Sequence, residues 1–252
     1  MSDYFDYSQY GEQKYILKAL GIKPDTFTEH AHPVGCPCGH CDGKGSVVQT
    51  AFVSIKPMGR LLEIGAFDAF AMSNSRALIE LGWSAVLFEP SPGPLRALVK
   101  EYGNNPKVEV VAAAVIVGGP NVLALRGMGA DKSNALVKLR ITDDAVTADA
   151  SNEAHLKKWE GYGFYGTMTV LGVSLARVFE VWGPFDFVSI DTEGTSADLF
   201  KRMIELGERP RCVVVEHDNR WDEMRKAAEL GGYRLMHDPK ENGTNVVLEL
   251  KP

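Results

Sequence analysis

Apolar residues along the chain form short continuous runs, which alternate with stretches where they recur every three to four positions. The continuous runs have the length and the Val, Ile and Leu content of buried strands, whereas the spaced stretches have the period of amphipathic helices. From about residue 60 onward the two patterns alternate regularly. We therefore expect an α/β fold with a doubly wound, mostly parallel sheet that carries helices on both faces.

The expected elements are bounded by residues that commonly end strands and helices, with glycine at most helix ends. Strands are predicted at 60–66, 84–90, 108–116, 185–194 and 211–218. Helices are predicted at 8–20, 73–82, 92–103, 173–183, 196–207 and 221–232. Ser8 is a candidate cap for the first helix, and Gly21 is its expected stop. The last part of the chain predicts an antiparallel hairpin with Asn242-Gly243 as its turn.

Three ranges of the chain differ in character. Residues 1–58 combine the first helix with a Cys/His-rich insertion that has no periodicity, and residues 59–252 form the regular α/β core. Within this core, residues 118–169 are mixed and polar, and strands and at least one helix are expected there. We expect this variable segment to contact the substrate or to cover it as a lid.

Charge and hydropathy limit the classes of partner. The net charge of −6 argues against binding of nucleic acid through a broad basic surface. No apolar run approaches the ~20 residues that span a bilayer, and the polar beginning of the chain does not fit a secretory signal. We expect a cytoplasmic protein without membrane contact, and the sequence leaves homo-oligomerisation open.

Cysteine and histidine are clustered in the segment HAHPVGCPCGHCDGKG. The clustering suggests a metal site, because a disulfide framework would use scattered cysteines. Three thiolates and one imidazole would make a tetrahedral structural zinc site. The candidate ligands are Cys36, Cys38, His40 and Cys41, with His30 or His32 as the alternative nitrogen donor. The other interpretations are a loop of free thiols and a site that another subunit completes.

Acidic residues surround the turn after the first core strand. Gly65 lets the backbone approach a ligand, whereas GAFDAF lacks the G-x-G-x-x-G pattern of a dinucleotide fold. Glu63 and Asp68 would repel a pyrophosphate but suit a sulfonium and an amino group. Glu89, roughly 20 residues beyond the glycine at the end of the next strand, can accept hydrogen bonds from ribose hydroxyls. Alternatively, Glu89 only caps a turn before Pro90.

The strings GRLLEIGAFDAFAMSNSRALIELGWSAVLFEPSP, FDFVSIDTEGTSADLF and RCVVVEHD resemble the FkbM-type methyltransferases, which have the class I, Rossmann-like fold. The N-terminal SQYGEQ is similar to a short polar motif that precedes the core in many relatives. The resemblance implies S-adenosylmethionine as the cofactor. Relatives usually have Gly where this chain has Ala69, so a methyl group is expected to narrow the loop. The positions that the resemblance assigns to the cofactor are Glu63, Gly65, Ala66, Asp68, Asn74, Glu89, Ser91 and Ala113.

Methyl transfer to a hydroxyl requires removal of a proton by a carboxylate, a histidine or a metal-bound group. Asp191 and Glu193 resemble the D-x-E-G element of the family, and Glu216 and His217 end the next strand. These four residues are the candidate catalytic groups. Asp191 could instead cap the helix that follows, and His217 could be structural. Carboxylates and a histidine in one cleft could also hold a divalent cation.

The function favoured by these patterns is S-adenosylmethionine-dependent methyl transfer to a hydroxyl of a small molecule or glycan. The resemblance, rather than any residue, selects oxygen as the acceptor atom. One alternative is a non-catalytic S-adenosylmethionine-binding or scaffold module. Another is an NAD(P)-linked oxidoreductase, which the missing glycines disfavour.

Overall fold

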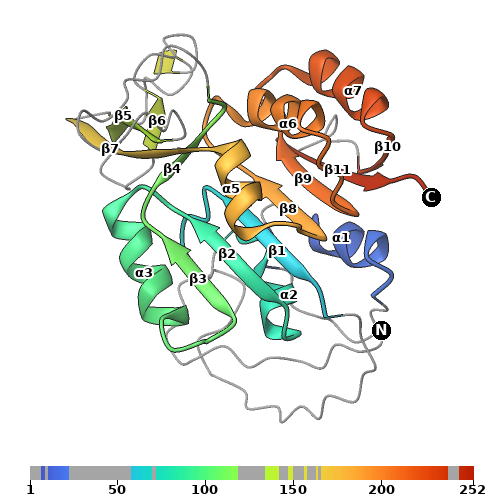
Figure 1. Ribbon diagram of the computed structural model, residues 1–252, viewed down its shortest axis with the longest axis horizontal. Helices are drawn as coiled ribbons and strands as arrows, with labels where there is room; N and C mark the ends of the chain where they lie inside the picture. The colour runs from blue at the N-terminus through green and yellow to red at the C-terminus, as the bar shows by residue number, and fades with distance from the viewer. Residues whose placement is uncertain are drawn as a thin grey trace.

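The computed structural model describes residues 7–8, 11–22, 58–69, 72–118, 134–141, 147–149, 156–157, 163, 166–237 and 244–252. Its centre is a seven-stranded sheet in the order β10-β11-β9-β8-β1-β2-β3 (Figure 1). The strands are β1 (Arg60–Ile64), β2 (Ser84–Phe88), β3 (Val108–Val111), β8 (Phe187–Ile190), β9 (Cys212–Glu216), β10 (Tyr233–His237) and β11 (Asn245–Leu250).

The sheet has the mostly parallel arrangement that the alternating pattern predicted. The strands β3, β2, β1, β8 and β9 pair in parallel, whereas β11 lies antiparallel between β9 and β10. The chain winds outward from β1 in one direction to β3 and then returns to β8 on the other side of β1. The carboxyl ends of β1 and β8 therefore flank the switch point where ligands bind in doubly wound sheets.

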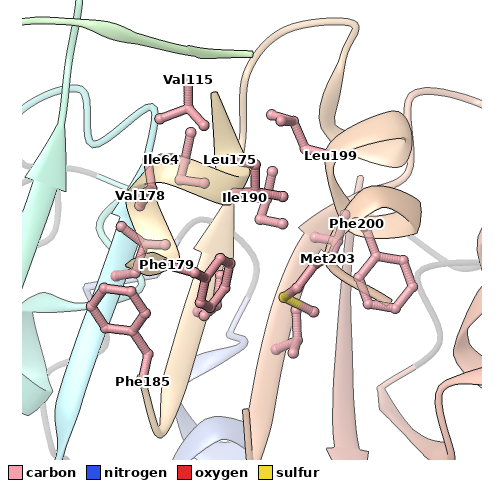
Figure 2. Close-up of a cluster of buried hydrophobic side chains, with 14 of the residues drawn as sticks. Ile64, Val115, Leu175, Val178, Phe179, Phe185, Ile190, Leu199, Phe200 and Met203 are labelled. Carbon is pink, nitrogen blue, oxygen red and sulfur yellow. The ribbon is translucent and has the colours of Figure 1, made fainter. Parts of the chain in front are cut away.

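Helices cover both faces of the sheet because successive strand residues point to opposite sides. Leu61, Leu87 and Phe187 belong to one core cluster, together with α1 (Gln13–Ala19), α2 (Arg76–Glu80) and α3 (Pro92–Tyr102). Their strand neighbours belong to the second cluster, with α5 (Leu175–Trp182), α6 (Ser196–Glu205) and α7 (Trp221–Leu230). Figure 2 shows part of the second cluster, where Ile64 and Ile190 lie among side chains of α5 and α6.

The first helix ends where the sequence predicted, but it begins five residues later than expected, at Gln13, with Glu12 rather than Ser8 at the N-cap position. The Ser8 hydroxyl accepts a hydrogen bond from the Gln13 amide at 3.1 Å, so this side chain satisfies a donor at the helix start. Gly21 has a φ of +69°, and the amide of Ile22 donates to the Leu17 carbonyl at 2.8 Å. This left-handed glycine and its hydrogen bond form a common helix stop.

The prediction of one strand over 108–116 was wrong. β3 ends at Val111, and β4 (Ala114–Ile116) leaves the large sheet to pair with β7 (Gly166–Ser174). β7 also pairs with β5 (Asn134–Ile141), which pairs with β6 (Thr147–Asp149), and these strands form a second, four-stranded sheet. In Figure 1 this sheet lies beyond the arrowheads of β2 and β3. An apolar run does not reveal that its two halves hydrogen-bond in different sheets.

The end of the chain forms the predicted hairpin. β10 and β11 pair antiparallel, with Tyr233 opposite Leu250. The proposed Asn242-Gly243 turn lies outside the described residues, as do the Cys/His-rich insertion and most of the variable segment. None of the helices in the described ranges is long and apolar enough to cross a membrane.

Candidate functional site

Acidic side chains gather where four neighbouring strands end. Glu63 lies in β1, Glu216 ends β9, and Glu89 and Asp191 directly follow β2 and β8. Side chains an even number of positions apart along a strand point to the same face of the sheet. The four acidic residues lie two or four positions after strand residues of the first core cluster, so they point to the face that carries α1–α3; these strand residues are Leu61, Leu87, Phe187 and Val214. The register sets Glu63 beside Leu87 and Ser189 on the adjacent strands. The parallel sheet thus brings together groups that are far apart in sequence.

Gly65 makes the turn after β1 fit between β2 and β8. Its φ is +78°, and a Cβ atom at this position would lie 1.7 Å from the carbonyl oxygen of Asp191. The amides of Gly65 and Ala66 both donate to the Phe88 carbonyl, at 2.9 and 3.0 Å. The turn is therefore fixed against both neighbouring strand ends, and only glycine fits.

Glu89 holds this turn through two backbone hydrogen bonds. The amide of Phe67 donates to Oε2 at 2.9 Å, and the amide of Ser91 donates to Oε1 at 2.7 Å. Burial raises the pKa of Glu89 to about 7, although both hydrogen bonds oppose the rise. The sequence left open whether Glu89 caps the turn before Pro90, and the Ser91 contact shows that it does. A carboxylate oxygen can accept more than one hydrogen bond, so the capping contacts still permit ligand binding.

Glu63 lies in a second buried polar group, at the start of α2. The Ser75 hydroxyl donates to Oε2, and the Asn74 amide donates to Oε1 at 3.2 Å. Burial is the main reason that the pKa of Glu63 rises to about 7. The side-chain amide nitrogen of Asn74 donates to the Ser189 hydroxyl at 3.2 Å. Its Oδ1 atom is buried and has no hydrogen-bond partner among the described residues.

Four other predicted cofactor positions surround this centre. Ala66 is buried beneath the turn, Asp68 is half-buried, and Ser91 is buried at the start of α3. Ala113 is buried between β3 and β4. These four residues thus lie along the carboxyl edge of β1–β3, and what they bind stays a prediction.

Ala69 does not strain the loop that its methyl group was expected to narrow. Phe67 and Met72 of this loop have left-handed φ values of +47° and +60°, whereas Ala69 is not left-handed. The Ala69 side chain is buried in the core cluster that includes Leu78 and Tyr102. Its methyl group therefore adds to the packing beneath the loop.

Arg76 fixes the other end of the loop. Its guanidinium donates to the Ala69 carbonyl at 2.6 Å and to Glu80 at 2.9 Å. It also lies over the Tyr7 ring at 5.0 Å from the centroid, and the Tyr7 hydroxyl contacts Glu80. Arg76 thus joins the N-terminal segment, α2 and the first loop.

Replacing Arg76 with alanine is expected to lower the free energy of unfolding by about 2 kcal/mol, because several hydrogen bonds to one charged group are lost. Urea denaturation monitored by circular dichroism measures this change. Arg225→Ala is the matched control, since Arg225 pairs with Glu229 and both side chains are well exposed. Equal stability of the two variants would show that Arg76 does not hold the loop.

The second half of the rim centres on Asp191. Burial raises the pKa of Asp191 to about 7, and the carboxyl of Glu193 raises it further, whereas a hydrogen bond with Glu216 lowers it. Glu193 lies beside it in a left-handed conformation, with a φ of +52°. Non-glycine residues in this conformation are uncommon and cluster at functional sites. The structure thus brings together three of the four predicted catalytic residues.

His217 has a local role in the structure. Its Nδ1 atom accepts a hydrogen bond from the Asn219 amide at 3.0 Å. Its own amide donates to the Thr244 carbonyl at 2.8 Å, which extends the pairing of β9 with β11. These contacts favour the structural interpretation of His217 that the sequence left open.

Asp191 does not cap α6. The Ala197 amide, at the start of that helix, donates to Asp218 Oδ2 at 3.1 Å. The Ser196 hydroxyl accepts from the Thr192 amide at 3.0 Å. Asp218 is a site residue that sequence reasoning missed, because the cap comes from the next strand end rather than from nearby sequence.

The N-terminal motif reaches the same rim. Tyr15 of α1 stacks on His237 at the end of β10, and Arg211 at the start of β9 donates to the Leu20 carbonyl at 3.1 Å. α1 therefore runs opposite to β9, with its first residues at the carboxyl edge. Glu12 and Gln13 are buried there. The SQYGEQ string contributed only to the family resemblance, and it did not predict that the start of α1 lies at the carboxyl edge of the sheet.

The predicted zinc ligands Cys36, Cys38, His40 and Cys41 lie outside the described residues, as do His30 and His32. Among the residues that the structure does describe, no group of three or more His, Cys, Asp or Glu side chains could hold a metal ion. The alternative of a divalent cation held by the rim carboxylates and a histidine therefore has no support in the described part of the chain.

Neither the comparison with protein-family models nor the comparison with curated proteins gives a match. Among solved structures, a fibrillarin pre-rRNA processing protein from Methanococcus jannaschii is 9% identical, with a TM-score of 0.38. The alignment covers 76% of this chain and 66% of the fibrillarin, so this chain spans just under two thirds of that protein.

Two further solved structures are similar at the same level. A fibrillarin from Aeropyrum pernix with natively bound S-adenosyl-L-methionine is 9% identical over 78% of this chain and 70% of its own, with a TM-score of 0.37. A methyltransferase from Podospora anserina, bound to SAH, is 12% identical over 77% of this chain and 72% of its own, with a TM-score of 0.35. These similarities assign no activity. The strand order of this chain is that of a Rossmann-like, doubly wound sheet, with an antiparallel strand inserted beside the fifth parallel one.

Proposed function

We propose that the protein is an S-adenosylmethionine-dependent methyltransferase related to the FkbM type, and that it methylates a hydroxyl of a small molecule or glycan. The observation that carries the proposal is the pair of buried carboxyls, Glu63 and Glu89, on either side of the Gly65 turn. Burial is unfavourable for a carboxylate, so two such groups at a switch point favour a ligand that supplies positive charge and hydroxyl donors.

The residues present fit the cofactor at both of its polar ends. The Oδ1 atom of Asn74 is a buried acceptor with no partner among the described residues, and the backbone amide of the same residue donates to Glu63. An ammonium group would satisfy this acceptor and balance the charge of the carboxyl. Glu89 would accept from ribose hydroxyls while it keeps its bonds to the amides of Phe67 and Ser91.

The same groups disfavour a dinucleotide. A pyrophosphate would need amide donors at the start of the following helix, and the turn would need more glycines. The amide of Phe67 is already bonded to Glu89, and that of Asn74 is bonded to Glu63. Two carboxyls would also lie against the phosphates.

When bound, the cofactor would supply a methyl carbon on a sulfonium, which a hydroxyl oxygen can attack in line. In such a transfer a C–O bond would replace the S–C bond, and the hydroxyl would have to lose its proton to a residue of the protein. Asp191 is the residue we assign to accept this proton. The Glu193 carboxyl raises its pKa, and the hydrogen bond with Glu216 orients it. The products are a methyl ether and S-adenosylhomocysteine.

Titration calorimetry with S-adenosylmethionine, S-adenosylhomocysteine and NAD tests the proposal. We expect both sulfur compounds to bind and NAD not to bind. Glu89→Gln is expected to weaken both sulfur compounds about 100-fold, because hydrogen bonds to a charged acceptor become bonds to a neutral one. Glu180→Gln is the control, since Glu180 is exposed on α5.

Binding of neither sulfur compound would contradict the proposal, whatever the result with NAD. Equal affinity of the Glu89→Gln and Glu180→Gln variants would contradict the role of Glu89 alone. Circular dichroism of each variant establishes that an altered affinity does not reflect loss of the fold.

A further inference from the structure

Asn245, the first residue of β11, carries a side-chain amide group to which none of the described residues hydrogen-bonds. The residue is 1% exposed, and neither its Oδ1 nor its Nδ2 atom has a hydrogen-bond partner among the described residues. An amide can form several hydrogen bonds, and leaving all of them unmade in the interior is unfavourable. A buried amide of this kind indicates a ligand that forms the missing hydrogen bonds.

The position of Asn245 directs this amide to the acidic rim. Asn245 lies opposite Glu216 in the pairing of β11 with β9. The adjacent hydrogen bond from the His217 amide to the Thr244 carbonyl makes this the closely spaced, non-hydrogen-bonded type of pair. Residues opposite each other share a face of the sheet, so the two side chains lie next to each other.

The surroundings of the amide are acidic. Glu216 hydrogen-bonds to Asp191, and the carboxyls of Glu193 and Asp218 are close enough to raise the pKa of Asp191. The nearby Arg220 does not balance this charge, because its guanidinium is bound to Asp198 and Glu223 on the helices. An anionic ligand would be repelled at this place.

We propose that Asn245, Glu216 and Asp191 form a subsite that binds a neutral hydroxyl-bearing molecule, of the sugar or polyol class, as the methyl acceptor. The role of the bound molecule as methyl acceptor rests on the proposed function. A hydroxyl both donates and accepts, so one group can satisfy the carbonyl of Asn245 and a neighbouring one its NH₂ group. An ammonium ion would leave the NH₂ group unpaired, and a carboxylate or phosphate would face four carboxyls.

The first test uses stability, which needs no ligand. Asn245→Leu and Asn245→Ala remove a side-chain amide that forms no hydrogen bond with the part of the chain that the structure describes, and Asn245→Ala adds no volume. We expect at least one of them to raise the melting temperature of the free protein by about 2–4 °C. Asn104→Leu, on the exposed turn after α3, is the control and should leave it unchanged. A structural role for the amide would instead lower the melting temperature in both variants, which would overturn the proposal.

The second test uses a panel of probes on protein loaded with S-adenosylhomocysteine. Methyl glucoside and myo-inositol are compared with glucuronate and glucose 6-phosphate by saturation-transfer NMR. We expect the neutral probes to bind at least about tenfold more tightly than the anionic ones, since like charges oppose binding. We expect Asn245→Ala, but not Asn104→Leu, to lose this binding.

Binding of the anionic probes as tightly as the neutral ones, or binding that survives in Asn245→Ala, would overturn the proposal. Absence of binding by every neutral probe would also count against it. The affinity for S-adenosylhomocysteine is measured in the same samples. If that affinity is absent while the neutral probes still bind through Asn245, the proposed methyl transfer fails and the subsite stands.

Discussion

Replacing Gly65 with alanine is expected to lower the free energy of unfolding by about 4 kcal/mol or more, since left-handed strain and overpacking add at this position. The added Cβ atom would lie 1.7 Å from the Asp191 carbonyl oxygen, which belongs to backbone and cannot rotate away. The turn and the end of β8 would have to separate. Urea denaturation measures the loss, and calorimetry with S-adenosylmethionine measures the accompanying loss of affinity.

Gly207→Ala provides a matched control for this variant. Gly207 has a φ of +84°, close to the +78° of Gly65, but a Cβ atom there would contact nothing within 4 Å. The control therefore carries the left-handed strain alone, which costs about 1 kcal/mol. Equal destabilisation in the two variants would mean that the contact with Asp191 is not what requires glycine at position 65.

Asp191→Asn is expected to lower kcat by about 10²- to 10⁴-fold, the usual contribution of a general base, while cofactor affinity stays within about twofold. The amide keeps the size of the carboxyl but does not accept the proton. Transfer of a radiolabelled methyl group to an acceptor from the neutral panel measures kcat. Asp222→Asn, on the exposed first turn of α7, is the control. Unchanged turnover would remove Asp191 from the mechanism.

The pKa of Asp191 gives this variant a second readout. A pKa of about 7 leaves the carboxyl protonated below neutral pH, so wild-type kcat should rise as the pH passes through 7. The raised pKa of Asp191 has the opposite effect on stability, which falls as the pH rises. The folded state holds a proton that the unfolded state releases near pH 4, so this group makes the fold less stable as the pH rises from about 4 to 7. Asp191→Asn should lack the rise in kcat and should show a weaker dependence of stability on pH, while Glu63 and Glu89, whose pKa values are also about 7, keep their own contributions.

Most of the fold could be predicted from the sequence because the spacing of apolar residues changes between each strand and the helix that follows it. The strands from β1 to β11 in the large sheet and the helices on its faces were expected near their observed positions, and the hairpin was confirmed. The division of 108–116 between two sheets could not be predicted, since apolar periodicity reports burial and not the partner strand. The small sheet depends on long-range pairing of β5 and β7, which leaves no local signal.

Part of the candidate site could also be predicted from the sequence, and part could not. Glu63, Glu89 and Asp191 could be placed together because parallel strands end at one edge of a sheet. Asn245 and Asp218 could not, since one comes from the antiparallel last strand and the other from a loop whose target is the start of α6. Arg76 was read as part of an amphipathic helix, whereas it fixes the first loop through the Ala69 carbonyl.

The insertion of β11 between β9 and β10 has a consequence for how the protein is made. A chain emerging from the ribosome can pair β1 with β2 and β3 early, and β8 and β9 can join them later. β10 then has no partner strand in the large sheet until residues 245–250 have been synthesised. N-terminal parts of a chain generally fold first, so β1–β3 and the Gly65 turn should form during synthesis. The rim around Asn245 can close only after the last strand has entered the gap.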